Sequence, residues 1–191
     1  MSTARKVDQL MTLAQYEEWE KRQTVRHEFY QGEVFSQAGG TRRHSQIGLN
    51  AAGAIRALLR GRDCIAHGSD MRISIEATGY QAYPDVSVVC PPIEGSSDDV
   101  ISNPVLLVEV LSPSTADFDP GGKFGHYRQI PSLEEYLVFW QDEPRVEHHT
   151  RTAEGNWLLR EMSGLDAVLF LQSLEANLPL REVYDKVDFS G

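Results

Sequence analysis

Hydrophobic residues recur at helical spacing in two stretches of the chain. Thr12 and Gln15 form a T-x-x-Q capping-box pattern, which predicts that a helix begins at this point. A longer helix is expected over residues 43–60, and Gly61 is expected to end it. Its apolar face would carry Ile47, Ala51, Ala54, Ile55 and Leu58.

Alternating or continuous apolar positions predict strands in much of the remaining chain. Residues 25–30 and 33–36 flank Gln31 and Gly32 and are expected to form a hairpin. The run VLLVEVL at 105–111 is the most apolar segment, typical of a central strand covered on both faces. Further strands are expected over residues 64–75, 86–90, 136–140, 146–150 and 157–161, a loop over 91–103, and short helices over 122–129 and near 180.

This order of elements predicts the fold class. A mixed α/β (α+β) fold is expected, with one central mixed β-sheet flanked by helices and preceded by an N-terminal helix and hairpin. A chain of 191 residues fits one domain, so residues 1–191 are expected to form a single unit with its core over residues 12–185.

Composition then excludes several classes of protein. Hydrophobic residues make up 41% of the chain and charged residues 24%, which excludes wholesale disorder. The chain has neither an apolar run long enough for a membrane span nor an apolar N-terminal segment typical of a secretory signal. A cytoplasmic protein without a membrane partner is therefore expected. Cys64 and Cys90 lack CxxC spacing, so neither a disulfide framework nor a zinc site is expected.

The charge is unevenly distributed along the chain. The net charge is −10, which disfavours an acidic polymer as partner. Residues 42–62, however, contain five arginines and no acid. This stretch is either a solvated helix face or a local phosphate-binding patch on an acidic protein. The candidate phosphate ligands in it are Arg42, Arg43, Arg56 and Arg60.

Glu109 is the first candidate for chemistry, because it lies in the middle of the apolar run at 105–111. A carboxylate inside a buried strand is costly unless it is paired or binds a metal ion. Two structural explanations compete with a functional one. The strand could lie at a sheet edge with one wet face, or the carboxylate could pair with an arginine.

Asp85 and Lys123 are the next candidates. Asp85 follows Pro84 at the start of a predicted strand, a common place for a carboxylate directed at a site. Lys123 is the only lysine between Lys21 and Lys186, and it begins a predicted helix, where positive charge is unfavourable. An ordinary Pro-Asp turn and a solvated lysine are the competing explanations.

Other chemistry-bearing residues favour structural roles. His148 and His149 are adjacent on a predicted strand and would point to opposite faces, which is poor geometry for metal binding. The three tryptophans at positions 19, 140 and 157 are expected to be core residues rather than a base-stacking platform.

Several segments of the chain form a recognisable combination when they are considered together. They are HEFYQGEV at 27–34, His44, YPDVSVV at 83–89, LLVEVLSPST at 106–115, KFGHY at 123–127 and EEYLV at 134–138. This combination resembles the bacterial putative restriction endonuclease family, a branch of the PD-(D/E)XK nuclease superfamily. The likeness covers residues 12–185 and implies a restriction endonuclease-like fold.

The resemblance implies a catalytic set of Asp85, Glu109 and Lys123. The superfamily usually places its lysine two residues after the glutamate, where this chain has Leu111. In the branch that this chain resembles, the lysine has moved to the following helix, which makes Lys123 its counterpart.

The implied chemistry is metal-dependent hydrolysis of phosphodiester bonds, by a Mg-dependent endodeoxyribonuclease leaving a 5′-phosphate. Asp85, Glu109 and the Val110 backbone carbonyl would offer oxygen ligands suited to Mg²⁺ or Mn²⁺. Lys123 would hold the attacking water or the phosphoryl oxygens. Glu28 is a candidate accessory acid, and His44 a candidate group behind the ligands or against a phosphate.

Alternatives to a DNA-cleaving enzyme stay open at this point. A non-catalytic nucleic-acid-binding or assembly module that has kept the fold would explain the net charge of −10. Retention of all three catalytic residue types argues against it. An RNA nuclease would use the same site, and the superfamily allows a homodimer that cuts two strands.

Overall fold

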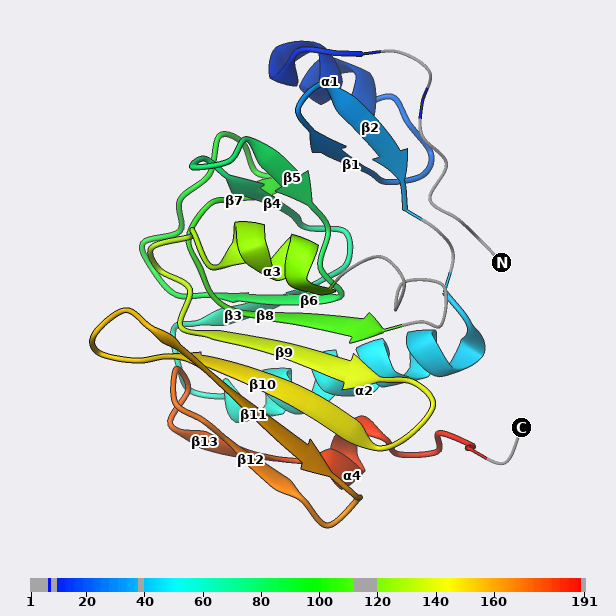
Figure 1. The fold of residues 1–191 in the computed structure, drawn as a ribbon, viewed down its shortest axis with the longest axis vertical. Coiled ribbons are helices and arrows are strands. Elements are labelled where there is room, and N and C mark those ends of the chain that lie inside the picture. Colours follow the sequence, from blue (N-terminus) through cyan, green and yellow to red (C-terminus); the bar gives the residue numbers. More distant parts are fainter. Residues whose placement is uncertain (1–6, 8–9, 38–39, 112–119, 190–191) are drawn as a thin grey trace.

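A six-stranded sheet forms the centre of the protein in a computed structural model that describes residues 7, 10–37, 40–111 and 120–189 (Figure 1). The strand order is β11-β10-β9-β8-β6-β3, and only β8 and β9 run parallel. The predicted central mixed sheet is thereby confirmed. Its strands are β3 (Ile65–Gly68), β6 (Val86–Val89), β8 (Pro104–Leu111), β9 (Glu135–Trp140), β10 (Arg145–Arg151) and β11 (Trp157–Ser163).

A second sheet, of five strands, was not predicted. A turn, closed by a hydrogen bond from the Met71 N–H to the Gly68 carbonyl, divides the segment 64–75 between the two sheets. The expected loop 91–103 likewise contains a two-residue strand. The second sheet has the order β2-β1-β5-β4-β7 and consists of β1 (His27–Tyr30), β2 (Glu33–Ser36), β4 (Arg72–Ile75), β5 (Tyr80–Ala82) and β7 (Val100–Ile101).

The helices begin close to their predicted positions. The Thr12 hydroxyl accepts a hydrogen bond from the Gln15 N–H, and the Gln15 side chain accepts one from the Thr12 N–H, which confirms the capping box. Thr41 caps the long helix in the same way, through the His44 N–H. No helix within the described ranges is long and apolar enough to cross a membrane. The helices are α1 (Leu13–Glu20), α2 (Arg42–Leu58), α3 (Pro120–Tyr127) and α4 (Leu180–Val183).

The two faces of the six-stranded sheet pack against different partners. Val108 and Val110 of β8 face the core shared with α2, whereas Leu107 and Leu111 face the core shared with Phe124 of α3. Glu109 alternates with the valines, so it points to the α3 side. Trp140 and Trp157 are partly buried against the core on the α3 side. Trp19 packs against a third, N-terminal core, so all three tryptophans are core residues, as predicted.

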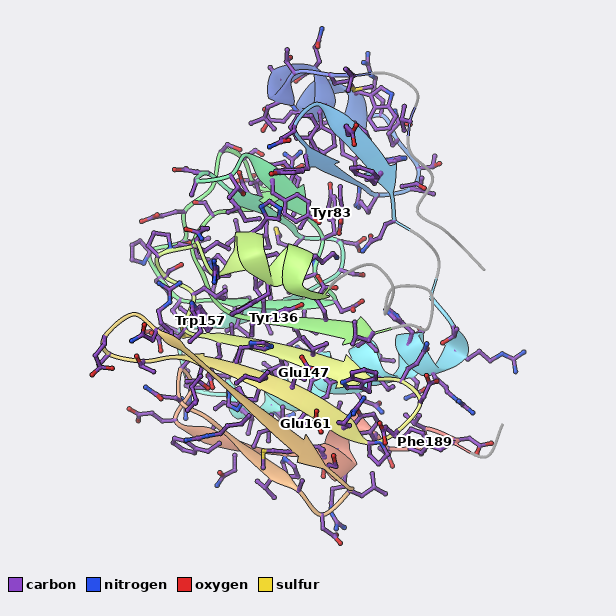
Figure 2. All side chains as sticks on the ribbon, viewed as in Figure 1. Tyr83, Tyr136, Glu147, Trp157, Glu161 and Phe189 are labelled. Atoms are coloured by element: carbon purple, nitrogen blue, oxygen red, sulfur yellow. A yellow bond between two sulfur atoms is a disulfide. The ribbon has the colours of Figure 1, made fainter. Side chains whose placement is uncertain are left out.

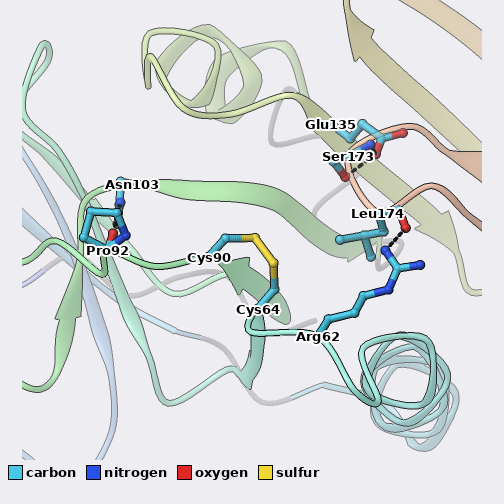
Figure 3. Close-up of a disulfide and its surroundings, with 8 residues drawn as sticks. All are labelled: Arg62, Cys64, Cys90, Pro92, Asn103, Glu135, Ser173 and Leu174. Atoms are coloured by element: carbon cyan, nitrogen blue, oxygen red, sulfur yellow. Dashed lines mark hydrogen bonds between the residues drawn. A yellow bond between two sulfur atoms is a disulfide. The ribbon is translucent and has the colours of Figure 1, made fainter.

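The expectation about the cysteines was wrong, because Cys64 and Cys90 form a disulfide (Figure 3). Strands β3 and β6 are antiparallel, with Ile65 opposite Val89. Continuing that register by one residue places the two cysteines opposite each other, with Cα atoms 4.1 Å apart. The pairing depends on strand register and therefore has no local sequence motif.

A buried carboxylate attaches the C-terminal hairpin, β12 (Val168–Leu171) and β13 (Ala176–Pro179), to the central sheet. Glu135 is fully buried and accepts hydrogen bonds from the backbone N–H groups of Gln172 and Ser173. Figure 3 shows Glu135 bound to Ser173. Nε2 of His148 lies 2.6 Å from the same carboxylate, while His149 packs on Phe124 across the sheet. The prediction that the two histidines point to opposite faces is confirmed.

Candidate active site

Strand pairing brings the two candidate carboxylates together. Val86 of β6 lies opposite Val108 of β8, so the next residues in the antiparallel register are Asp85 and Glu109. Oδ2 of Asp85 accepts a hydrogen bond of 2.7 Å from the Val110 N–H. Both carboxylate side chains are 13% exposed. The two acids thus face the same region at the end of a buried strand pair.

Lys123 reaches this pair from helix α3. Its Nζ lies 3.0 Å from Oε1 of Glu109 and 2.8 Å from Oε1 of Glu28, which β1 of the other sheet contributes. Lys123, which the resemblance places in one set with Asp85 and Glu109, thus contacts Glu109 directly. Glu28 also belongs to the cluster, as the sequence had suggested.

Two tyrosines complete the cluster, and the sequence analysis assigned a role to neither. The Tyr127 hydroxyl donates to Oε1 of Glu109 at 2.7 Å, and the Tyr80 hydroxyl donates to Oε2 of Glu28 at 2.5 Å. Tyr127 comes four residues after Lys123, and this helical spacing is a signal that could have revealed it. Tyr80 has no comparable signal, because its position depends on the pairing of β5 with β1.

The N-terminal end of α2 lies beside Asp85. Nε2 of His44 is 3.5 Å from Oδ2 of Asp85. One turn further on, Gly48 also lies beside Asp85, because a Cβ at this position would make an ordinary contact of 4.0 Å with the Asp85 Cβ. His44, one of the candidate accessory groups, thus lies next to Asp85, and the helix begins at the site.

Burial dominates the electrostatics of the cluster. It raises the pKa of Glu109 to about 7, although the adjacent Lys123 ammonium opposes that rise. It also raises the pKa of Asp85 above its ordinary value, against the influence of His44. Burial by itself would lower the pKa of Lys123, but Glu109 and Glu28 raise it well above the usual range. The lysine therefore stays a cation, while the carboxylates favour a compensating positive charge.

The donor set fits a hard divalent cation. The hydrogen bonds described above use Oδ2 of Asp85 and Oε1 of Glu109. A carboxylate has two acceptor oxygens, so the second oxygen of each acid is the one that would bind a metal ion. Within the described ranges, no group of three or more His, Cys, Asp or Glu side chains has metal-binding geometry. Two carboxylates and the Val110 carbonyl, completed by water, would suit Mg²⁺, which usually keeps several waters.

The candidate arginines divide between the two ends of α2. Arg42 is exposed at the helix start, and Arg43 lies next to it with a guanidinium nitrogen 3.8 Å from Asp142. Arg56 and Arg60 instead line a surface cavity of about 400 Å³ beside β3. At 1.5 Å per residue, Arg56 is roughly 18 Å along the helix from His44. Only the first pair lies at the end of α2 whose His44 contacts Asp85.

Known proteins share this architecture. The solved structure of "a putative nuclease belonging to DUF820 from Anabaena variabilis ATCC 29413" matches with a TM-score of 0.75, covering 91% of this chain and 97% of that chain. The sequence identity is 17%, so this likeness defines the fold, which is one adopted by a nuclease-like protein. Residues 13–181 match the Uma2 family, described as "Putative restriction endonuclease", and the chain belongs to that family.

Two relatives come from Synechocystis sp. (strain ATCC 27184 / PCC 6803 / Kazusa). "Uncharacterized protein slr1290" is 34% identical over 175 residues, which cover 92% of both chains. "Uncharacterized protein sll1609" is 38% identical over 160 residues, which cover 83% of this chain and 90% of the relative. The resemblance to the putative restriction endonuclease family that was inferred from the sequence motifs is confirmed.

Proposed function

We propose that the protein is a Mg²⁺-dependent endonuclease that hydrolyses phosphodiester bonds in DNA. One observation carries this proposal: Asp85 just before β6, Glu109 in β8 and Lys123 in α3 meet in one cluster, with 3.0 Å between Nζ of Lys123 and Oε1 of Glu109. Burying two acids and a lysine together is costly for stability, so a structural role alone gives little reason for the arrangement.

The carboxylates and the lysine would have different tasks. Asp85, Glu109 and the Val110 carbonyl would hold Mg²⁺, which when bound lowers the pKa of a coordinated water and neutralises developing phosphate charge. Lys123 donates hydrogen bonds to the attacking water or to the phosphoryl oxygens, as a compact cation. Its protonated state suits that task, because the neighbouring acids keep its pKa high.

The remaining polar groups support these three residues. Glu28 is a second acid that binds the Lys123 ammonium, at 2.8 Å, and the Tyr80 hydroxyl donates a hydrogen bond to Glu28 in turn. Tyr127 engages Oε1 of Glu109. His44 lies at the start of α2, 3.5 Å from Asp85, where its ring can contact a phosphate bound beside the carboxylates.

Cleavage of supercoiled plasmid across a Mg²⁺ titration tests the proposal. Wild-type protein is expected to nick the plasmid only with Mg²⁺ or Mn²⁺. Asp85→Ala and Glu109→Ala are each expected to abolish nicking while the fold stays intact or becomes more stable, because two like charges are relieved.

Glu161→Ala is the matched control for these variants. Glu161 lies in the same cross-strand row as Glu109, through Val138 and Glu147, but three strands away (Figure 2). This variant is expected to cleave like wild type. If wild-type protein shows neither cleavage nor a rise in melting temperature with divalent metal, a non-catalytic binding or assembly module becomes the better explanation.

A further inference from the structure

Glu20 is a buried acid that lies outside the cluster around Lys123. It is 4% exposed and is the last residue of α1. A negative charge at the C-terminal end of a helix opposes the helix dipole, and burial adds a desolvation cost. Such a residue is maintained only where hydrogen bonds compensate it, so the groups that it binds indicate what it does.

The Glu20 carboxylate binds two segments that are far apart in the chain. Its Oε1 accepts hydrogen bonds from the His27 N–H at 2.8 Å and from the Tyr83 hydroxyl at 3.2 Å. Its Oε2 lies 2.9 Å from Nδ1 of His27. His27 directly precedes Glu28, and Tyr83 lies two residues before Asp85. One buried carboxylate therefore joins the backbone segments that carry two acids of the site.

A second contact strengthens this connection. The Gln37 side chain, just after β2, donates a hydrogen bond of 2.9 Å to the Tyr83 carbonyl. The C-terminal end of the β1–β2 hairpin thus binds the Tyr83 backbone directly, whereas its N-terminal end is linked to the Tyr83 hydroxyl through Glu20. Figure 2 shows Tyr83 next to this hairpin. The register between β1 and β5 consists of a single pair, Phe29 with Gln81. Side-chain contacts therefore contribute much of what holds the hairpin in place.

We propose that Glu20 and Tyr83 are positioning residues that set the distance between Glu28 and Asp85. The inference rests on the proposed nuclease function and goes beyond it, because it assigns a part in catalysis to the N-terminal helix. Glu28 holds the Lys123 ammonium, so a hairpin that shifts away from Tyr83 would displace the lysine relative to the metal-binding acids. Groups that orient metal ligands typically change metal affinity or activity about 10–100-fold when removed.

Tyr83→Phe tests the proposal with the removal of one oxygen atom. Tyr184→Phe is the matched control, because both tyrosines are 3% exposed and Tyr184 hydrogen-bonds the backbone of Trp140 and Arg145 behind the sheet. Both variants are expected to lower the melting temperature by similar amounts. Only Tyr83→Phe is expected to weaken Mn²⁺ binding, measured by calorimetry, and to lower kcat on a DNA duplex by about tenfold.

Glu20 supplies the second test. Glu20→Gln keeps an acceptor for the His27 N–H and the Tyr83 hydroxyl, and is expected to bind Mn²⁺ within about threefold of wild type, whereas Glu20→Ala loses about tenfold. Equal Mn²⁺ affinity and kcat for wild type, Tyr83→Phe and Glu20→Ala would overturn the positioning role alone. Failure of wild-type protein to bind Mn²⁺ and to cleave DNA would instead overturn the proposed function, and this inference with it.

Discussion

Lys123 and Glu109 are 14 residues apart in the chain, yet their side chains meet at 3.0 Å between Nζ and Oε1. The lysine comes from α3 and approaches over the face of the sheet, rather than from the same strand as the glutamate. From that direction it also reaches Glu28 of the five-stranded sheet. The ion pairs of Lys123 therefore join the six-stranded and the five-stranded sheet at the candidate site.

Replacement of Lys123 by methionine separates its catalytic from its structural contribution. The variant leaves Glu28 and Glu109 without their shared cation, so the free energy of unfolding at pH 8 is expected to fall by about 1–3 kcal/mol. Cleavage is expected to fall by at least about 100-fold. Urea titration and plasmid nicking measure the two effects. Lys186→Met, at an exposed position, is the control. If the two variants have the same free energy of unfolding and the same cleavage rate, the role assigned to Lys123 is wrong.

The pH dependence of stability should reveal Glu109. Its pKa is raised from 4.5 to about 7 in the folded protein, mainly by burial. The stability linked to this group is therefore fully present below pH 4.5 and is lost as the pH rises to about 7. Glu109→Gln, which stays neutral, is expected to be more stable than wild type by about 1–3 kcal/mol at pH 8, with little difference at pH 4.

Melting curves across this pH range measure the effect. Mg²⁺ at pH 8 is expected to raise the melting temperature of wild-type protein and to leave that of Glu109→Gln almost unchanged, because the variant lacks one of the two carboxylates. A variant that is less stable than wild type at pH 8 would show that the Lys123 ion pair outweighs the cost of burying the charge.

The salt dependence of DNA binding tests the arginines at the start of α2. With cleavage blocked by Ca²⁺, each lost phosphate contact reduces the slope of log K against log salt by about one unit. Arg42→Ala/Arg43→Ala is expected to reduce the slope by about two, because this pair lies at the helix end that contacts Asp85. Arg56→Ala/Arg60→Ala is expected to leave it nearly unchanged. The reverse result would place the duplex along the opposite end of α2.

Reduction of the disulfide should affect stability without affecting the site. Cys64 and Cys90 are 26 residues apart, and a closed loop of that length stabilises a fold by about 3 kcal/mol. The double serine variant is expected to lose about this amount in urea unfolding. Mn²⁺ affinity is expected to stay constant, since Cys90 follows β6 whereas Asp85 precedes it. An unchanged melting temperature with dithiothreitol would indicate that the cysteines are free thiols.

Local signals made the helices and the acidic pair predictable. The capping box at Thr12 and the apolar run around Glu109 can each be recognised from a few consecutive residues. The β1–β2 hairpin and the segment that contains β4 were expected as strands, but β5 and β7 have three and two residues, too few to show alternation, so the second sheet could not be predicted. Tyr80 and the disulfide depend on which strands pair, and no local pattern encodes that.

Glu135 has a consequence for how far the chain can be shortened. The carboxylate is fully buried, and burial by itself would raise its pKa, but hydrogen bonds from His148 and Ser173 lower it, so it is held ionised. A chain that stops after β11 would lose the donors at Gln172 and Ser173 and leave a charge in the interior beside the sheet. The smallest unit that folds independently should therefore extend past the C-terminal hairpin, even though every candidate catalytic residue lies within the first 127 positions.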